Sequence, residues 1–127
     1  MSGYIINIEE KTLANGYFRE VLFTVKNSQL VVMSIAVGED IGEEVHNNVD
    51  QFLRIESGEG KAVLDGEETI IKDGFAVIVP AGVKHNIINT SDSRPLKLYT
   101  LYAPPEHRDK TIHKTKVEAL TDKNNHV

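Results

Sequence analysis

Turn-forming residues recur along this chain at short intervals and divide it into brief apolar runs. Asn15-Gly16, Asp65-Gly66, Asp73-Gly74 and Pro80-Ala81-Gly82 are four of these turns. The runs between them are rich in Val, Ile, Leu, Phe and Tyr, as in "QLVVMSIAV", "QFLRIES", "FAVIV" and "LKLYTLY". No long window has the period of an amphipathic helix. Many short strands at close spacing predict an all-β sandwich or barrel.

Local signals place one hairpin and two short helices. Asp65-Gly66 lies between two apolar runs and predicts a two-residue hairpin, because a type I′ turn needs positive φ at both central residues. Asp73-Gly74 predicts a second turn. Short helical turns are expected around Ile8–Leu13 and in "KTKVEAL" near the C-terminus. Residues 121–127, "TDKNNHV", are expected to form a frayed tail.

Length and charge limit the class of protein. A chain of 127 residues fits one domain, which we place at 1–127. A net charge of −5 argues against a nucleic-acid-binding surface. Without cysteine, neither a disulfide framework nor a thiolate metal site can form. The N-terminus does not resemble a signal peptide, and no apolar run is long enough to span a membrane, so a cytoplasmic protein is expected.

Four polar side chains are predicted to face the interior. Glu44 and His46 are two residues apart, so they face the same way if the segment is extended. Gln51 opens the run "QFLRIES" on its apolar face, and His85 opens the run "HNIIN". Buried polar groups need partners, and one divalent ion would satisfy all four. Taken singly, these residues are more often ordinary polar residues near turns, so the pattern alone leaves both interpretations open.

The first of two motifs covers residues 38–58. Gly38 is followed after five residues by Glu44-x-His46, after four more by Gln51, and after six more by Gly58. This spacing is that of the first motif of the cupin superfamily, which normally reads Gly, His-x-His, Glu, Gly.

The second motif covers residues 74–89 and matches the family in every residue type. It runs from Gly74 through Pro80-x-Gly82 to His85 and Asn89. The chain therefore resembles the small single-domain bacterial cupins. The resemblance implies a double-stranded β-helix, also called a jelly-roll barrel, which agrees with the strand pattern.

The resemblance also implies a metal site, with two departures from the usual ligands. Carried over by position, the ligands are Glu44, His46, Gln51 and His85. Glu44 replaces the usual first His, and Gln51 replaces the usual Glu. Two imidazoles and one carboxylate suit Fe²⁺ with open coordination positions, and the oxygen ligands suit Mn²⁺ equally well. Zn²⁺ and Ni²⁺ stay open. We expect one divalent ion per chain and no other cofactor.

The expected function is that of a small metal-dependent enzyme. Its substrate would be a small molecule that chelates through two oxygens, and its chemistry that of a dioxygenase or of a sugar or keto isomerase. No inward carboxylate besides Glu44 stands out as a base, and no catalytic residue is assigned. The alternative is a metal-dependent binding or sensor module without catalysis, because fold does not determine function.

Three further expectations concern residues outside the motifs. His107 and His113, in the arm "APPEHRDKTIHKTK", are expected to be exposed, and whether this arm closes over the site stays open. At most one of Tyr99 and Tyr102 can line the interior, where it would pack in the core. The outward Phe52 and the apolar N-terminal segment "GYIINI" predict a homodimer.

Overall fold

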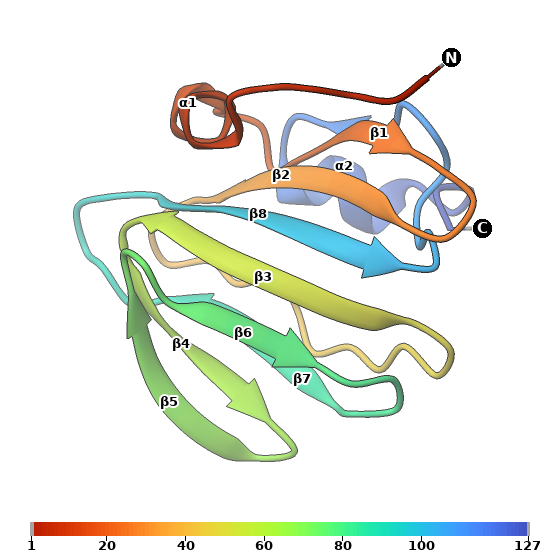
Figure 1. Ribbon diagram of the computed structural model, residues 1–127. Coiled ribbons are helices and arrows are strands. Elements are labelled where there is room, and N and C mark those ends of the chain that lie inside the picture. The colour runs from red at the N-terminus through yellow and green to blue at the C-terminus, as the bar shows by residue number, and fades with distance from the viewer. Residues whose placement is uncertain (1, 127) are drawn as a thin grey trace.

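The computed structural model describes residues 2–126 and contains two antiparallel sheets (Figure 1). The six-stranded sheet has the order β6-β3-β8-β2-β1-β9, and the three-stranded sheet has the order β5-β4-β7. The strands are β1 (Arg19–Thr24), β2 (Gln29–Ile35), β3 (Asp50–Ser57), β4 (Glu59–Leu64), β5 (Glu67–Lys72), β6 (Ala76–Val79), β7 (His85–Asn89), β8 (Leu96–Ala103) and β9 (Ile112–His113). The predicted all-β barrel is confirmed.

The core lies between the two sheets and is built by residue alternation along the strands. On β3, Gln51, Leu53 and Ile55 are buried while the residues between them are partly exposed. On β7, His85, Ile87 and Asn89 are buried in the same way. Because side chains alternate between the faces of a strand, the sequence pattern predicted these inward faces correctly.

The turn at Asp65-Gly66 joins β4 and β5 as a tight hairpin. Both residues have positive φ, 49° and 83°, as a type I′ turn requires. Asp73-Gly74 does not form a hairpin, because β5 pairs with β4 whereas β6 pairs with β3. This second turn carries the chain from one sheet to the other.

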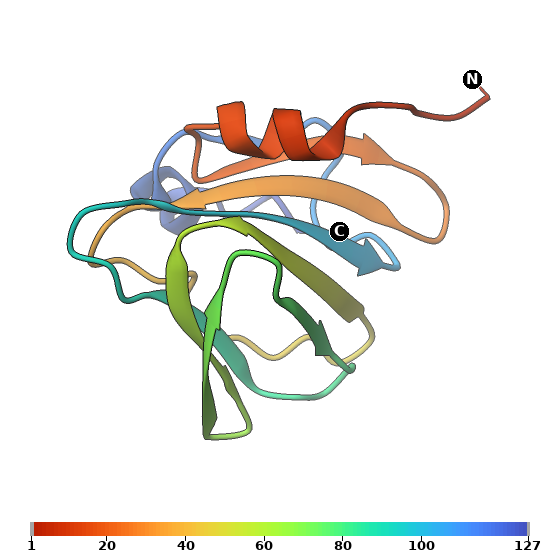
Figure 2. The same cartoon turned by 60° about the vertical axis from the view of Figure 1, so that its left-hand side comes forward.

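Two short helices form near the two ends of the chain, as predicted. Helix α1 (Ile8–Ala14) begins at Asn7, whose Oδ1 accepts the N–H of Glu10 at 3.0 Å. It lies on the outer face of the six-stranded sheet, away from the three-stranded one (Figure 2). Helix α2 (Lys116–Thr121) begins at Thr115, whose hydroxyl accepts the N–H of Glu118 at 3.2 Å. Neither helix is long and apolar enough to cross a membrane.

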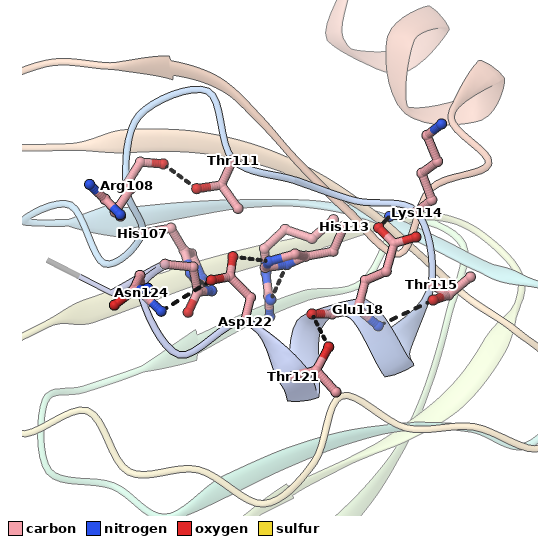
Figure 3. A network of polar contacts seen from close by, with 12 residues as sticks. His107, Arg108, Thr111, His113, Lys114, Thr115, Glu118, Thr121, Asp122 and Asn124 are labelled. Atoms are coloured by element: carbon pink, nitrogen blue, oxygen red, sulfur yellow. Dashed lines mark hydrogen bonds and ion pairs between the residues drawn. The ribbon is translucent and has the colours of Figure 1, made fainter.

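The C-terminal segment is packed, which corrects two expectations. His107 and His113 are buried, with 1% and 2% of their surface exposed, because the chain after α2 folds back over them. The carboxylate of Asp122 accepts a hydrogen bond from His113 Nε2 at 2.9 Å (Figure 3), and the Asn125 amide contacts His107 Nδ1 at 3.0 Å. The prediction of a frayed tail is therefore wrong for residues 121–126, and Val127 lies outside the described residues.

Candidate metal centre

Three side chains from two segments meet inside the barrel. Glu44 and His46 belong to the irregular stretch between β2 and β3, and His85 begins β7. One ligand atom from each residue lies within 4.8 Å of the other two. A carboxylate and two imidazoles at this spacing can share one divalent ion.

Backbone hydrogen bonds place Glu44 directly opposite His85. The N–H of each residue donates to the carbonyl of the other, both at 2.9 Å. Side chains of such a pair lie on the same face of the sheet, so the pairing brings the carboxylate beside the imidazole. A further backbone bond, from Gly82 N–H to the His46 carbonyl at 2.8 Å, holds the next part of this stretch.

The His85 ring is oriented by its own strand entry. Its Nδ1 donates to the carbonyl of Val83 at 2.9 Å, which leaves Nε2 as the free nitrogen. Hydrogen bonding by one ring nitrogen to a backbone carbonyl is how metal-binding histidines are commonly held. The His85 ring is therefore oriented with Nε2 free to bind a metal ion.

His46 lies between two carboxylates. Its Nε2 is 3.8 Å from Glu44 Oε2, and its Nδ1 is 3.5 Å from Glu106 Oε2. Burial lowers the pKa of His46 below its ordinary value, and the charge of Glu44 opposes this only in part. The neutral imidazole that results is the form that binds a metal ion.

Gln51 has a buried oxygen with no partner. The residue is 4% exposed, its amide nitrogen donates to Thr100 Oγ1 at 3.0 Å, and its Oε1 accepts no hydrogen bond from the part of the chain that the structure describes. Its cross-strand partner is Tyr102, whose ring packs edge-on against His46 at a centroid distance of 6.1 Å. A buried acceptor without a donor is costly, and an ion beside it would satisfy it. The donor set therefore fits a divalent metal.

Sequence reasoning missed Glu106, which the structure brings to the site. Gln29 of β2 holds this part of the chain, since its Oε1 accepts the N–H groups of Glu106 and His107 at 3.2 and 3.0 Å. Burial and the charge of Glu44 raise the pKa of Glu106 to about 7. The residue follows Pro104-Pro105 outside any strand, so no alternation pattern indicated its direction.

The same surroundings contain Tyr102, which lines the interior whereas Tyr99 does not. Tyr102 is 2% exposed and packs edge-on against both His46 and His107. Burial raises the pKa of Tyr102 far above its ordinary value, so its hydroxyl stays neutral. The expectation that one tyrosine faces inward is confirmed, but this one borders the candidate site as well as the core.

Comparison with known proteins identifies similar chains. A family model described as "Cupin domain" matches residues 31–102. The chain is 47% identical over 124 residues to the uncharacterized protein YrkC of Bacillus subtilis, covering 92% of this chain and 66% of that protein. It is 41% identical to the uncharacterized protein L612 of Acanthamoeba polyphaga mimivirus, covering 82% and 67%. The chain thus spans about two thirds of the length of these relatives.

A solved structure shares the fold closely. The crystal structure of BH2720 from Bacillus halodurans superposes with a TM-score of 0.90 at 44% identity, covering 92% of each chain. The region matched by the family model contains all four residues of the predicted ligand set.

Proposed function

Since the chain belongs to the cupin domain family, we propose that it is a metal-dependent enzyme acting on a small molecule that chelates through oxygen. Glu44, His46 and His85 would hold one divalent ion, with Gln51 as a weaker fourth ligand. The observation that carries this proposal is the meeting of three ligand atoms within 4.8 Å inside the barrel. Shared membership alone would not assign a function.

The composition of the donor set favours Fe²⁺ or Mn²⁺. Two imidazoles with one carboxylate are typical of non-haem Fe²⁺ sites, and carboxylate and amide oxygens are typical of Mn²⁺ sites. When bound, such an ion supplies Lewis-acid activation of a chelated carbonyl, or a site for dioxygen chemistry. The reaction would then be a dioxygenation or a keto or sugar isomerisation.

The chain's own residues would orient and shield this centre. The Val83 carbonyl keeps Nε2 of His85 free, and Glu106 lies where it can hold the Nδ1–H of His46. The buried ring of Tyr102 packs at nearly a right angle to the His46 ring and would cover that side of the imidazole. A carboxylate that orients a ligating histidine typically strengthens metal binding tenfold or more.

The first test is elemental analysis of freshly purified protein. We expect about one equivalent of metal in the wild type and almost none in the His46→Ala, His85→Ala double variant. The His126→Ala variant is the control, because His126 lies beside the site, 3.3 Å from Glu106, but outside the three-residue cluster. Full metal content in the double variant would refute the site. Removal of the metal by a chelator should also lower Tm, because an ion that binds only the folded state stabilises it.

The second test asks whether the metal-loaded protein turns over substrate. Oxygen consumption and isomerisation are measured over a set of diketones and keto-sugars, with the double variant as the blank. Turnover that depends on His46 and His85 would support an enzyme. Stoichiometric metal without turnover across the set would contradict the enzyme and favour the binding module.

A further inference from the structure

A pocket of about 360 Å³ lies directly beside Glu44. The pocket is lined by the start of β1, with Arg19, and by the C-terminal segment, with Leu120 and Asn125. Its size falls within the range of pockets that bind small molecules. The pocket therefore joins the candidate metal centre to residues that the two sequence motifs do not include.

Arg19 is a buried cation that forms no ion pair with any of the residues that the structure describes. Its surface is only 5% exposed, its Nε makes no hydrogen bond, and none of the ion pairs among residues 2–126 includes it. A guanidinium in such surroundings is costly unless an anion accompanies it. The shape of the guanidinium matches a carboxylate, to which it can donate two parallel hydrogen bonds.

The neighbours of Arg19 hold it in place without neutralising it. Arg19 Nη1 donates to His113 Nδ1 at 3.1 Å, so the proton of this imidazole is on Nε2. That Nε2–H donates to Asp122 at 2.9 Å, so this carboxylate at the pocket is bonded to the imidazole and not to the guanidinium. The chain of bonds orients Arg19 and leaves its charge available.

The other polar groups around the pocket either already contact polar partners or have an atom that is available for hydrogen bonding. Of the three carboxylates that line the pocket, Glu43 lies 3.7 Å from Lys84 Nζ, Asp122 is bonded to His113, and Glu44 belongs to the metal cluster. Glu106, close by, lies against His46 and His126 at 3.5 and 3.3 Å. The Oδ1 of Asn125, a residue that is 2% exposed, has no hydrogen-bond partner among residues 2–126. A ligand in this pocket would thus meet an unneutralised cation and an unused acceptor beside the metal centre.

We propose that Arg19 binds a carboxylate of the substrate, whose chelating oxygens face the ion held by Glu44, His46 and His85. This inference rests on the proposed function and narrows its substrate class to small oxo or hydroxy acids with a carboxylate distant from the chelating group. Asn125 Oδ1 accepts a hydrogen bond from a hydroxyl group of the same ligand or from a water molecule that is bound to it.

The test compares acids that differ only in the distant carboxylate. Calorimetric titration of Mn²⁺-loaded protein with 2-oxoglutarate and 2-oxopentanoate forms one pair, and oxaloacetate and 2-oxobutanoate form a shorter pair. We expect at least one dicarboxylate to bind about tenfold or more tightly than its matched monocarboxylate, because a charge-assisted pair is added. If the wild type binds the dicarboxylate and the monocarboxylate of both pairs with equal affinity, the proposal is wrong, and no variant is needed to show this.

Variants of Arg19 test whether this residue causes the preference for the dicarboxylate. In Arg19→Gln the two acids of the preferred pair should bind with about equal affinity, while the metal content stays at one equivalent. Arg19→Lys should retain part of the preference for the dicarboxylate, since a lysine keeps the charge but loses the two parallel hydrogen bonds. Arg54→Gln is the matched control, because Arg54 is half exposed on the outer face of β3 and paired with Glu56 at 3.3 Å. A preference that survives in Arg19→Gln overturns the assignment.

Failure of the metal site can be distinguished from failure of the anion site. Glutarate carries two carboxylates but lacks the chelating 2-oxo group, so its binding to metal-free protein reports on the pocket alone. Weak glutarate binding that disappears in Arg19→Gln supports the anion site even if the wild type holds no metal. Metal binding with no dependence of any acid on Arg19 refutes the anion site and leaves the proposed metal function standing.

Discussion

Glu44 is the only anionic side chain in the three-residue cluster, and its loss should cost more metal affinity than any change at Gln51. Glu44→Gln replaces a carboxylate by a neutral amide of the same shape, so we expect most of the metal to be lost. Gln51→Ala removes an amide oxygen only, and we expect a modest loss. Competition titration with a chromophoric chelator measures both. Stronger loss in Gln51→Ala than in Glu44→Gln would contradict the role given to Glu44.

The reverse change at the same position should tighten the site. Gln51→Glu restores the carboxylate usual at this motif position and adds a second anion next to the metal. We expect tighter binding by about 1.5–3 kcal/mol, the range for hydrogen bonds to charged groups. Turnover should fall, because a less positive centre polarises a bound substrate less. Unchanged affinity in the same chelator competition would show that this side chain does not reach the ion.

His107 should make the metal-free protein sensitive to acid. Burial first, and then the charges of Arg19, His126, His113 and His46, lower the pKa of His107 to about 2, against an ordinary value of 6.5. Between these two pH values the unfolded chain binds a proton that the folded chain does not, so stability falls as the pH falls. The expected slope is about 1 kcal/mol per pH unit below pH 6.5.

Urea unfolding in the presence of a chelator, at pH 7 and pH 5, checks this slope. His107→Gln keeps a polar group near Asn125 and Tyr102 but cannot be protonated in this range. The variant should be less stable than the wild type at pH 7 and should lose less stability between the two pH values. Parallel pH profiles for both proteins would show that the imidazole does not titrate on unfolding.

At the scale of the elements, Gly60 sets how closely β4 approaches its neighbours. A Cβ built on Gly60 would lie 2.2 Å from the carbonyl oxygen of Ile88 and 3.0 Å from a Leu96 methyl carbon. We expect Gly60→Ala to destabilise the protein by about 3 kcal/mol or to prevent folding, because backbone must move. Gly16→Ala is the control, since nothing lies within 4 Å of its Cβ. Equal unfolding midpoints for the two variants would show that β4 can shift without cost.

Gly60 stands two residues after Gly58, where a turn would be expected from the sequence, yet it lies inside β4 and pairs with Ile71 and Asn89. Gly58 is the turn residue of the two, with φ of 113°. A glycine needed for close approach and a glycine needed for a turn look alike in a sequence. Only the neighbouring strands distinguish them.

On the scale of the whole molecule, an apolar row crosses the outer face of the six-stranded sheet. Ile78, Phe52 and Leu101 are cross-strand neighbours on β6, β3 and β8, and Ile78 and Leu101 are 65% and 38% exposed. Leu30 and Phe23 continue the row across β2 and β1. A contiguous exposed apolar patch commonly marks a surface that binds another protein.

We therefore expect the row to be buried in a homodimer. Light scattering after size-exclusion chromatography should give twice the chain mass of 14.1 kDa for the wild type. The Phe52→Ser, Ile78→Lys double variant should be a monomer. Ile70→Lys, at an exposed isoleucine of the other sheet, should stay dimeric. A wild-type monomer at micromolar concentration would refute the dimer, and a dimeric double variant would place its interface elsewhere.

The sequence by itself determined the strands, their inward faces and the residues that meet at the candidate metal centre. Residue alternation is a local property, so the burial of Gln51, His85 and Asn89 could be deduced without knowing which strands are neighbours. Alternation could not show that Glu44 and His46 meet a histidine some forty residues away. The resemblance of the two motifs to those of the cupins implied this meeting.

Only the tertiary structure decided what surrounds that centre. Arg19 and His113 are 94 residues apart in sequence, and Glu106 lies in a stretch without regular structure. Outside strands and helices no period relates one side chain's direction to the next, so the sequence could not predict that Glu106 turns inward. Arg19 and His113 begin and end short strands, and no local pattern indicated that these two strands are neighbours. Their placement follows from long-range packing of the C-terminal segment against β1 and β2, which supplies the hydrogen-bond partners that buried polar groups require.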